Sequence, residues 1–109
     1  MTTLAALFLV AHGLVHLAVW LPSPAADAPF DPGRSWLLGD ARPAARTLAS
    51  VACAALVLSG ALILPGAGAG AALAVAGAAI SLALVLLTFN PWLMGAVAID
   101  VAIVLVALA

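Results

Sequence analysis

The sequence predicts an all-α fold, an integral membrane four-helix bundle with one long loop between its first two helices. Of the 109 residues, 68% are hydrophobic and only 6% are charged, whereas about a quarter of the residues in a soluble domain carry charge. The apolar residues form continuous runs of about 20, the length that an α-helix needs to cross a bilayer. Because these runs do not alternate with polar residues, they do not match the strands of a membrane β-barrel.

Four apolar runs occupy nearly the whole chain, which we interpret as a single transmembrane domain over residues 1–109. The expected spans are residues 3–21, 44–64, 71–89 and 92–109, and the loop is 22–43. A cleavable signal peptide is the alternative for the first run, since Ala26-Asp27-Ala28 is similar to a signal-peptidase site. The opening residues supply no basic region, and an apolar run of about 19 residues exceeds the usual signal-peptide core. We therefore expect four spans.

Two short breaks predict which helices are neighbours. The stretch PGAGAG, residues 65–70, ends one helix and permits a tight reversal, so the second and third spans should be antiparallel neighbours. Asn90 is a good helix N-cap, and Pro91 suits the first helical position. The third and fourth spans should therefore also lie side by side.

The charged residues cluster around the loop and predict an orientation. Arg34, Arg42 and Arg46 all lie on the loop side of the first span, and basic residues are enriched on the cytoplasmic side of membrane proteins. We therefore expect a multi-pass protein of the cell membrane with loop 22–43 in the cytoplasm. The apolar stretch SWLLG, residues 35–39, is too short to span, and we expect it to lie in the membrane interface as a lid beside the first span.

Two histidines and one aspartate lie within the apolar spans. His12 and His16 are four residues apart and share one face of the first span, while Asp100 is the only acidic residue in any span. At about 1.5 Å of rise per residue, His12 lies roughly 13 Å and Asp100 roughly 12 Å from the loop-side interface. Ser81 and Cys53 lie at the same level, and we expect both to be mainly packing residues. A charged aspartate in mid-span costs about 2.5–3.5 kcal/mol, so it should face the bundle and pair with the histidines. We therefore expect the last span to pack directly against the first.

Several functional interpretations fit His12, His16 and Asp100. Two imidazoles and a carboxylate can bind a transition metal such as zinc, copper or iron, with Cys53 as a further soft ligand. Haem fits less well, because one helix face cannot place both histidines on opposite sides of the iron. The same groups can relay a proton or form a path for a small molecule. They can also be interhelical hydrogen-bond contacts alone, worth about 0.6–2 kcal/mol each.

We predict from these residues an intramembrane site, in a cavity on the loop side, that binds a metal ion or a small polar ligand. The alternative is an accessory or assembly protein of a membrane complex whose polar groups only hold the helices together. The sequence contains no activated nucleophile that would indicate an enzyme. Most of the helix surface of so small a bundle is exposed, so we expect contact with the lipid bilayer and a homo-oligomer or larger complex, and no nucleic-acid partner.

Three stretches, VAHGLVHLAVW, PFDPGRSWLLGD and FNPWLMGAVAIDVAIV, resemble the small four-helix integral membrane proteins of bacteria that carry an HGxxH first helix. His12, Gly13 and His16 supply that element here, and Asp100 supplies a polar residue in the last helix. The resemblance extends over nearly the whole chain. It implies the four-helix fold but no particular activity, because proteins of this kind are functionally uncharacterised.

Overall fold

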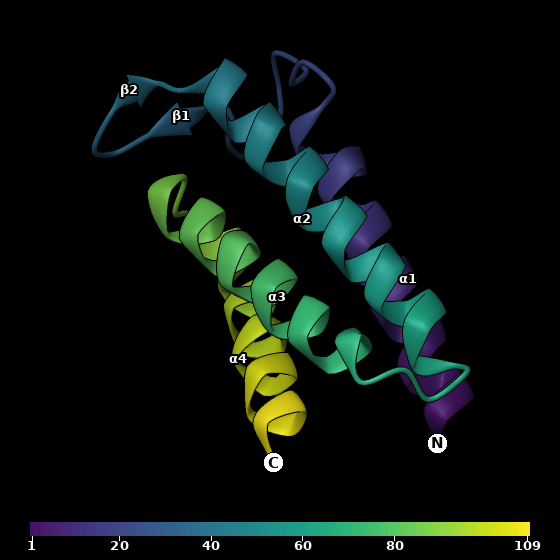
Figure 1. Ribbon diagram of the computed structural model, residues 1–109. Helices are drawn as coiled ribbons and strands as arrows, with labels where there is room; N and C mark the ends of the chain where they lie inside the picture. The colour runs from purple at the N-terminus through teal and green to yellow at the C-terminus, as the bar shows by residue number, and fades with distance from the viewer.

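The computed structural model describes residues 1–109 as four long α-helices and one small β-hairpin (Figure 1). The helices are α1 (Thr2–Trp20), α2 (Arg42–Ile63), α3 (Ala69–Leu87) and α4 (Met94–Leu108), and a short 3₁₀-helix, η1 (Pro91–Leu93), leads into α4. Each of the four, with η1 counted as part of α4, is long and apolar enough to cross a membrane. The prediction of four such helices is therefore confirmed.

The helix boundaries differ from the expected spans by one or two residues. At α2 the helix begins two residues early, at Arg42, because Pro43 fits the first turn of a helix, where a missing N–H costs no hydrogen bond. Asn90 acts as the expected N-cap, and its side-chain oxygen accepts a hydrogen bond from the Trp92 N–H at 3.1 Å. The start of the last helix therefore follows from its capping residues.

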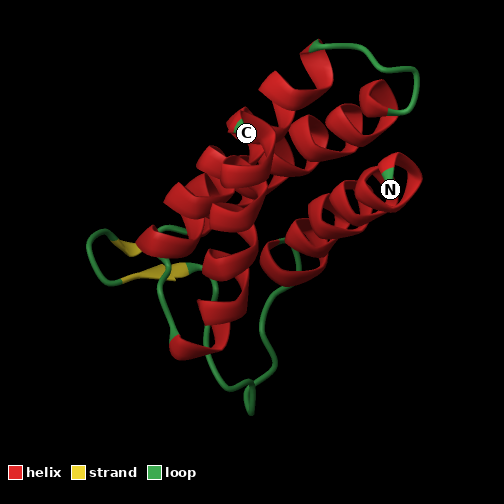
Figure 2. Ribbon diagram, turned by 90° about the horizontal axis from the view of Figure 1, so that it is seen from below, coloured by secondary structure: helices red, strands yellow, loops and turns green.

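The helices pack in chain order, α1 on α2, α2 on α3 and α3 on α4 (Figures 1 and 2). The short connections explain the last two contacts, as the sequence predicts. In contrast, α1 and α4 do not approach closely along their length. The expectation that α4 packs directly against α1 therefore needs correction, because no short turn forces these two helices together and they meet only through side chains.

Glycine lets α1 and α2 come very close. A Cβ atom at Gly60 would lie 2.8 Å from the carbonyl oxygen of Ala6, and one at Gly13 would lie 3.1 Å from the carbonyl oxygen of Cys53. Small residues at such points allow the backbones of membrane helices to touch. The contact between these two helices is therefore made largely by the backbones themselves.

The connection between α1 and α2 is not a plain loop. It contains two antiparallel strands, β1 (Arg34–Ser35) and β2 (Gly39–Asp40), and Gly39 has a φ of 73°, which favours glycine. The indole N–H of Trp36, between the strands, donates a hydrogen bond of 2.6 Å to the carbonyl oxygen of Leu86 in the last turn of α3, where helix carbonyls lack partners. The hairpin therefore lies beside α3, and the expected position beside the first span is wrong.

An ion pair ties the start of this connection to α2. The Arg42 side chain donates to both carboxylate oxygens of Asp31, at 2.9 and 2.8 Å, and the N–H of Gly33 donates to one of them at 2.9 Å. Partial burial disfavours the charged form of Asp31, but the bonds from Gly33 and Arg42 outweigh it and hold the pKa of Asp31 below its usual value. The clamp therefore depends on an ionised carboxylate.

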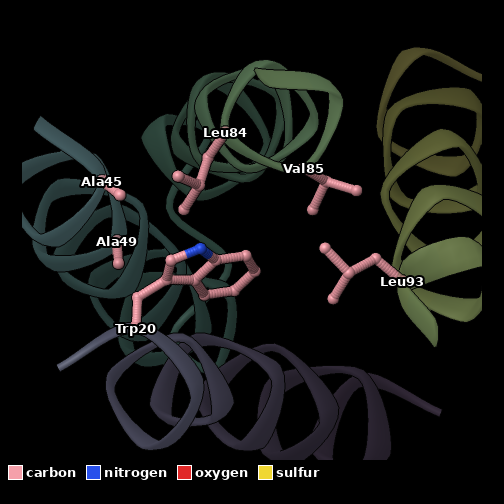
Figure 3. Close-up of a cluster of buried hydrophobic side chains, with 6 residues drawn as sticks. All are labelled: Trp20, Ala45, Ala49, Leu84, Val85 and Leu93. Carbon is pink, nitrogen blue, oxygen red and sulfur yellow. The ribbon is translucent and has the colours of Figure 1, made fainter. Parts of the chain in front are cut away.

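The buried core consists of two apolar clusters with a polar level between them. The cluster near the hairpin contains Trp20, Ala45, Ala49, Leu84, Val85 and Leu93. Figure 3 shows the indole of Trp20 extending from α1 into the space between α2, α3 and the start of α4. The other cluster contains Leu9, Leu56, Ala74, Ala78 and Ile103. Along α1, α3 and α4, the buried polar residues lie between a member of one cluster and a member of the other.

Candidate functional site

Three helices bring four polar side chains together at this polar level. His12 and His16 come from α1, Ser81 from α3 and Asp100 from α4. Their exposed fractions are 8%, 2%, 0% and 0%, respectively. The aspartate therefore faces the interior of the bundle and not its surface.

Hydrogen bonds join the four side chains into one chain. His12 Nε2 lies 2.8 Å from Asp100 Oδ1, and the other carboxyl oxygen, Oδ2, lies 2.5 Å from Ser81 Oγ. Ser81 Oγ in turn lies 2.6 Å from His16 Nε2. His16 Nδ1 donates to the main-chain carbonyl oxygen of His12 at 2.8 Å. Both oxygens of Asp100 and both ring nitrogens of His16 are thus occupied.

These bonds restrict where the protons can be. A carbonyl oxygen only accepts, so His16 carries a proton on Nδ1. The Ser81 hydroxyl has one proton and can donate it to Asp100 or to His16. In the first arrangement Asp100 is a carboxylate and His16 an imidazolium. In the second arrangement His16 is neutral, and Asp100 carries the proton on Oδ2 and donates it to Ser81.

One ring nitrogen of the network has no hydrogen-bond partner. In the neutral tautomer in which His12 Nε2 donates to Asp100 Oδ1, His12 Nδ1 retains its lone pair. His12 is also the most exposed of the four residues. A metal ion or a hydrogen-bond donor can therefore bind at His12 Nδ1 in that tautomer without breaking a bond of the network.

Four rings spaced by four residues line one face of α1. Phe8 stacks on His12 with ring centres 6.0 Å apart, His12 meets His16 edge-on at 5.0 Å, and His16 stacks on Trp20 at 5.6 Å. An aromatic face stabilises a neighbouring cation, so Trp20 favours the imidazolium form of His16. The regular spacing of these rings is a sequence signal that the histidine pair alone does not reveal.

Two expectations about serine and cysteine are corrected by the structure. Ser81, expected mainly to pack, bridges His16 and Asp100 and is essential to the continuity of the network. Cys53 makes no hydrogen bond and lines a separate hollow with Leu14 and Leu17 on another face of α1. It therefore does not contribute a sulfur ligand to this site.

Metal binding by His12, His16 and Asp100 stays a prediction. The structure contains no group of three His, Cys, Asp or Glu side chains placed to hold a metal ion. The principal hollows are lined by other residues, and not by this trio as the expected loop-side cavity would be. The polar side chains instead fill the space between the helices by bonding to one another.

Comparison with known proteins adds no family to this description. No protein-family model matches the chain, and no curated protein or solved structure matches it. The resemblance to bacterial proteins with an HGxxH first helix therefore stays a prediction.

Proposed function

We propose that this protein is a multi-pass protein of the cell membrane whose buried His12–Asp100–Ser81–His16 network takes up and passes on a proton. Four helices have the length and composition of membrane spans. Large apolar side chains such as Leu7, Leu58 and Leu105 are exposed on their outer faces, as expected where the surrounding solvent is lipid. The buried polar level is then the place within the spans where ionisable side chains are joined by hydrogen bonds.

The observation that carries the proposal is that the same heavy-atom positions satisfy two proton arrangements. In passing from one to the other, the His16 Nε2–H bond breaks as its proton moves to Ser81 Oγ, and the hydroxyl proton of Ser81 moves to Asp100 Oδ2. His16 becomes neutral, Asp100 becomes a carboxylic acid, and the total charge is unchanged. No helix has to move for this transfer, since every donor and acceptor is already within hydrogen-bond distance.

Opposing effects act on the two arrangements. Burial disfavours separated charges on His16 and Asp100. The ring of Trp20 and the bonds from His12 and Ser81 favour them. When Asp100 is a carboxylate, a proton arriving at His12 Nδ1 would place an imidazolium directly beside that anion, which stabilises the added charge.

A second candidate is binding of a metal ion or a small polar ligand, and the unpartnered His12 Nδ1 favours it. That nitrogen is available without disturbing the network. Coordination by His12, His16 and Asp100 together would instead have to break hydrogen bonds within the network, because the Asp100 oxygens and the His16 ring nitrogens are already engaged. Metal analysis of detergent-purified protein, compared with a variant lacking both histidines, tests this candidate directly.

The proton proposal is testable because the chain has only two histidines. Protein with isotope-labelled histidine, reconstituted in lipid, should show ring-nitrogen NMR signals of His16 that change with pH together with the carboxyl infrared band of Asp100. Ser81→Ala should uncouple the two signals, because it removes the hydroxyl between them. Asp100→Asn provides the control without a titrating carboxyl.

A single unchanged protonation state for both rings, across the pH range in which the protein stays folded, would exclude a proton function. The polar groups would then be interhelical contacts only, as in the accessory or assembly alternative.

Membrane topology is tested with two cysteine variants in a Cys53→Ala background. Ser23→Cys lies in the connection between α1 and α2, and Gly68→Cys lies in the turn between α2 and α3, where a side chain meets no neighbour. The four-span proposal predicts that a membrane-impermeant thiol reagent labels them from opposite sides, with Ser23→Cys reached from the cytoplasm. Association of several copies through the apolar outer faces stays a proposal to be tested by crosslinking in the same membranes.

A further inference from the structure

An apolar groove separates α1 from α4 in the half of the bundle away from the hairpin. Its volume is about 440 Å³ and all its lining residues are hydrophobic, among them Phe8 of α1 and Ala102 and Ile103 of α4. It lies between α1 and α4, whose backbones are not in close contact; we call this region the α1–α4 seam. The volume falls within the range of small-molecule sites, which are mostly apolar with a few polar groups.

The polar network borders the inner end of this groove. Phe8, which lines the groove, lies parallel to the ring of His12, with ring centres 6.0 Å apart. Ile99 and Ile103, which also line it, stand one residue before and three residues after Asp100 in α4. The Phe8 side chain is 48% exposed, so it has room to turn outward and let a bound molecule reach His12.

The groove differs from a phospholipid site, which holds a charged head group at the membrane surface. Its outer end lies toward the turn between α2 and α3, where residues 64–70 carry no charged side chain. All three arginines are at the other end of the bundle, near the hairpin. The lining of the groove therefore contains no cationic side chain that could hold a phosphate at the membrane surface, and the nearest buried polar side chain is that of His12, behind Phe8.

We infer that the groove binds the hydrocarbon tail of an uncharged, lipid-soluble molecule whose hydroxyl head donates a hydrogen bond to His12 Nδ1, as a quinol or alkylphenol would. A hydroxyl donor is required because Nδ1 is an acceptor when Nε2 donates to Asp100. An uncharged head is required because it must lie at the depth of the buried network. This inference rests on the proposed proton network, and it names the class of molecule that meets it.

The test uses decylphenol and its methyl ether, decylanisole, as matched probes with the same tail. Decylphenol should shift the ring-nitrogen NMR signal of His12 Nδ1 saturably in reconstituted protein. The ether cannot donate a hydrogen bond and should bind about two- to tenfold more weakly, without that shift. Ala102→Phe should fill the groove and abolish binding of both probes, whereas Ala61→Phe, on a different hollow between α1 and α2, should leave binding intact.

Equal binding of the two probes without a change at His12 would overturn the inference and show a groove that takes up hydrocarbon alone. Unchanged binding in Ala102→Phe would overturn it as well. The pH titration of the two histidines without any probe is a separate measurement. If the histidine signals do not change with pH but decylphenol still binds, only the proton function is contradicted. If the histidine signals change with pH but decylphenol does not bind, only the groove inference is contradicted.

Discussion

Helix α1 uses two faces in different ways, one toward α2 and one toward α4. Toward α2, Gly13 and Gly60 allow backbone atoms to touch, and no polar side chain bridges the contact. Toward α4, the backbones stay apart beside an apolar groove, and the hydrogen bond from His12 to Asp100 joins the helices. The first seam depends on shape and does not respond to pH. The second depends on a polar contact that a proton can change.

The largest effect on stability should come from the α1–α2 seam. Gly60→Ala places a methyl group 2.8 Å from the carbonyl oxygen of Ala6, and relieving that overlap requires the two backbones to separate. We expect a loss of about 1–3 kcal/mol in the free energy of unfolding, measured by reversible unfolding in mixed micelles. Gly95→Ala is the matched control, because its Cβ meets nothing within 4 Å and alanine favours a helix over glycine. A Gly60→Ala protein as stable as Gly95→Ala would refute the close backbone contact.

A smaller loss should follow from breaking the α1–α4 contact. Asp100→Ala removes the partner of His12 Nε2 and one of the two partners of Ser81, and we expect a cost of about 0.6–2 kcal/mol. Spin-label distances should lengthen between α1 and α4 but not between α1 and α2. Asp100→Asn keeps an oxygen for His12 and an N–H for Ser81, so its distances should match those of the unmodified protein. Equal widening of both seams in Asp100→Ala would show that they are not independent.

The smallest effect concerns the clamp outside the spans. Because the pKa of Asp31 is lowered in the folded protein, its ion pair with Arg42 stabilises the fold above the usual pH range of carboxyl titration. That contribution is lost as the pH falls through the lowered pKa. The amide NMR signal of Gly33, whose N–H donates to Asp31, should therefore shift at a pH below that of an ordinary aspartate, while signals from α1 stay constant. Asp31→Asn should abolish the shift, and a midpoint at or above the ordinary value would contradict the clamp.

The levels of the polar groups along the bundle could be predicted from the sequence alone. The rise of an α-helix is fixed, so counting residues from the interface places His12, Ser81 and Asp100 at one depth. The turns at 65–70 and at Asn90 set the order of the last three helices for equally local reasons. These predictions required no knowledge of how the helices rotate or cross.

The bonding within that level was decided only by the tertiary structure. Depth does not determine the rotation of a helix about its axis, and the rotation is what directs Ser81 between His16 and Asp100 and turns Cys53 to another face. Likewise, the hairpin lies beside α3 because Trp36 finds an unpaired carbonyl there, which is a contact between residues 50 positions apart. The groove exists because glycines draw α1 onto α2 while no turn draws it onto α4. The length of each helix follows from its own residues, whereas the direction in which each side chain faces is determined by packing against neighbouring helices.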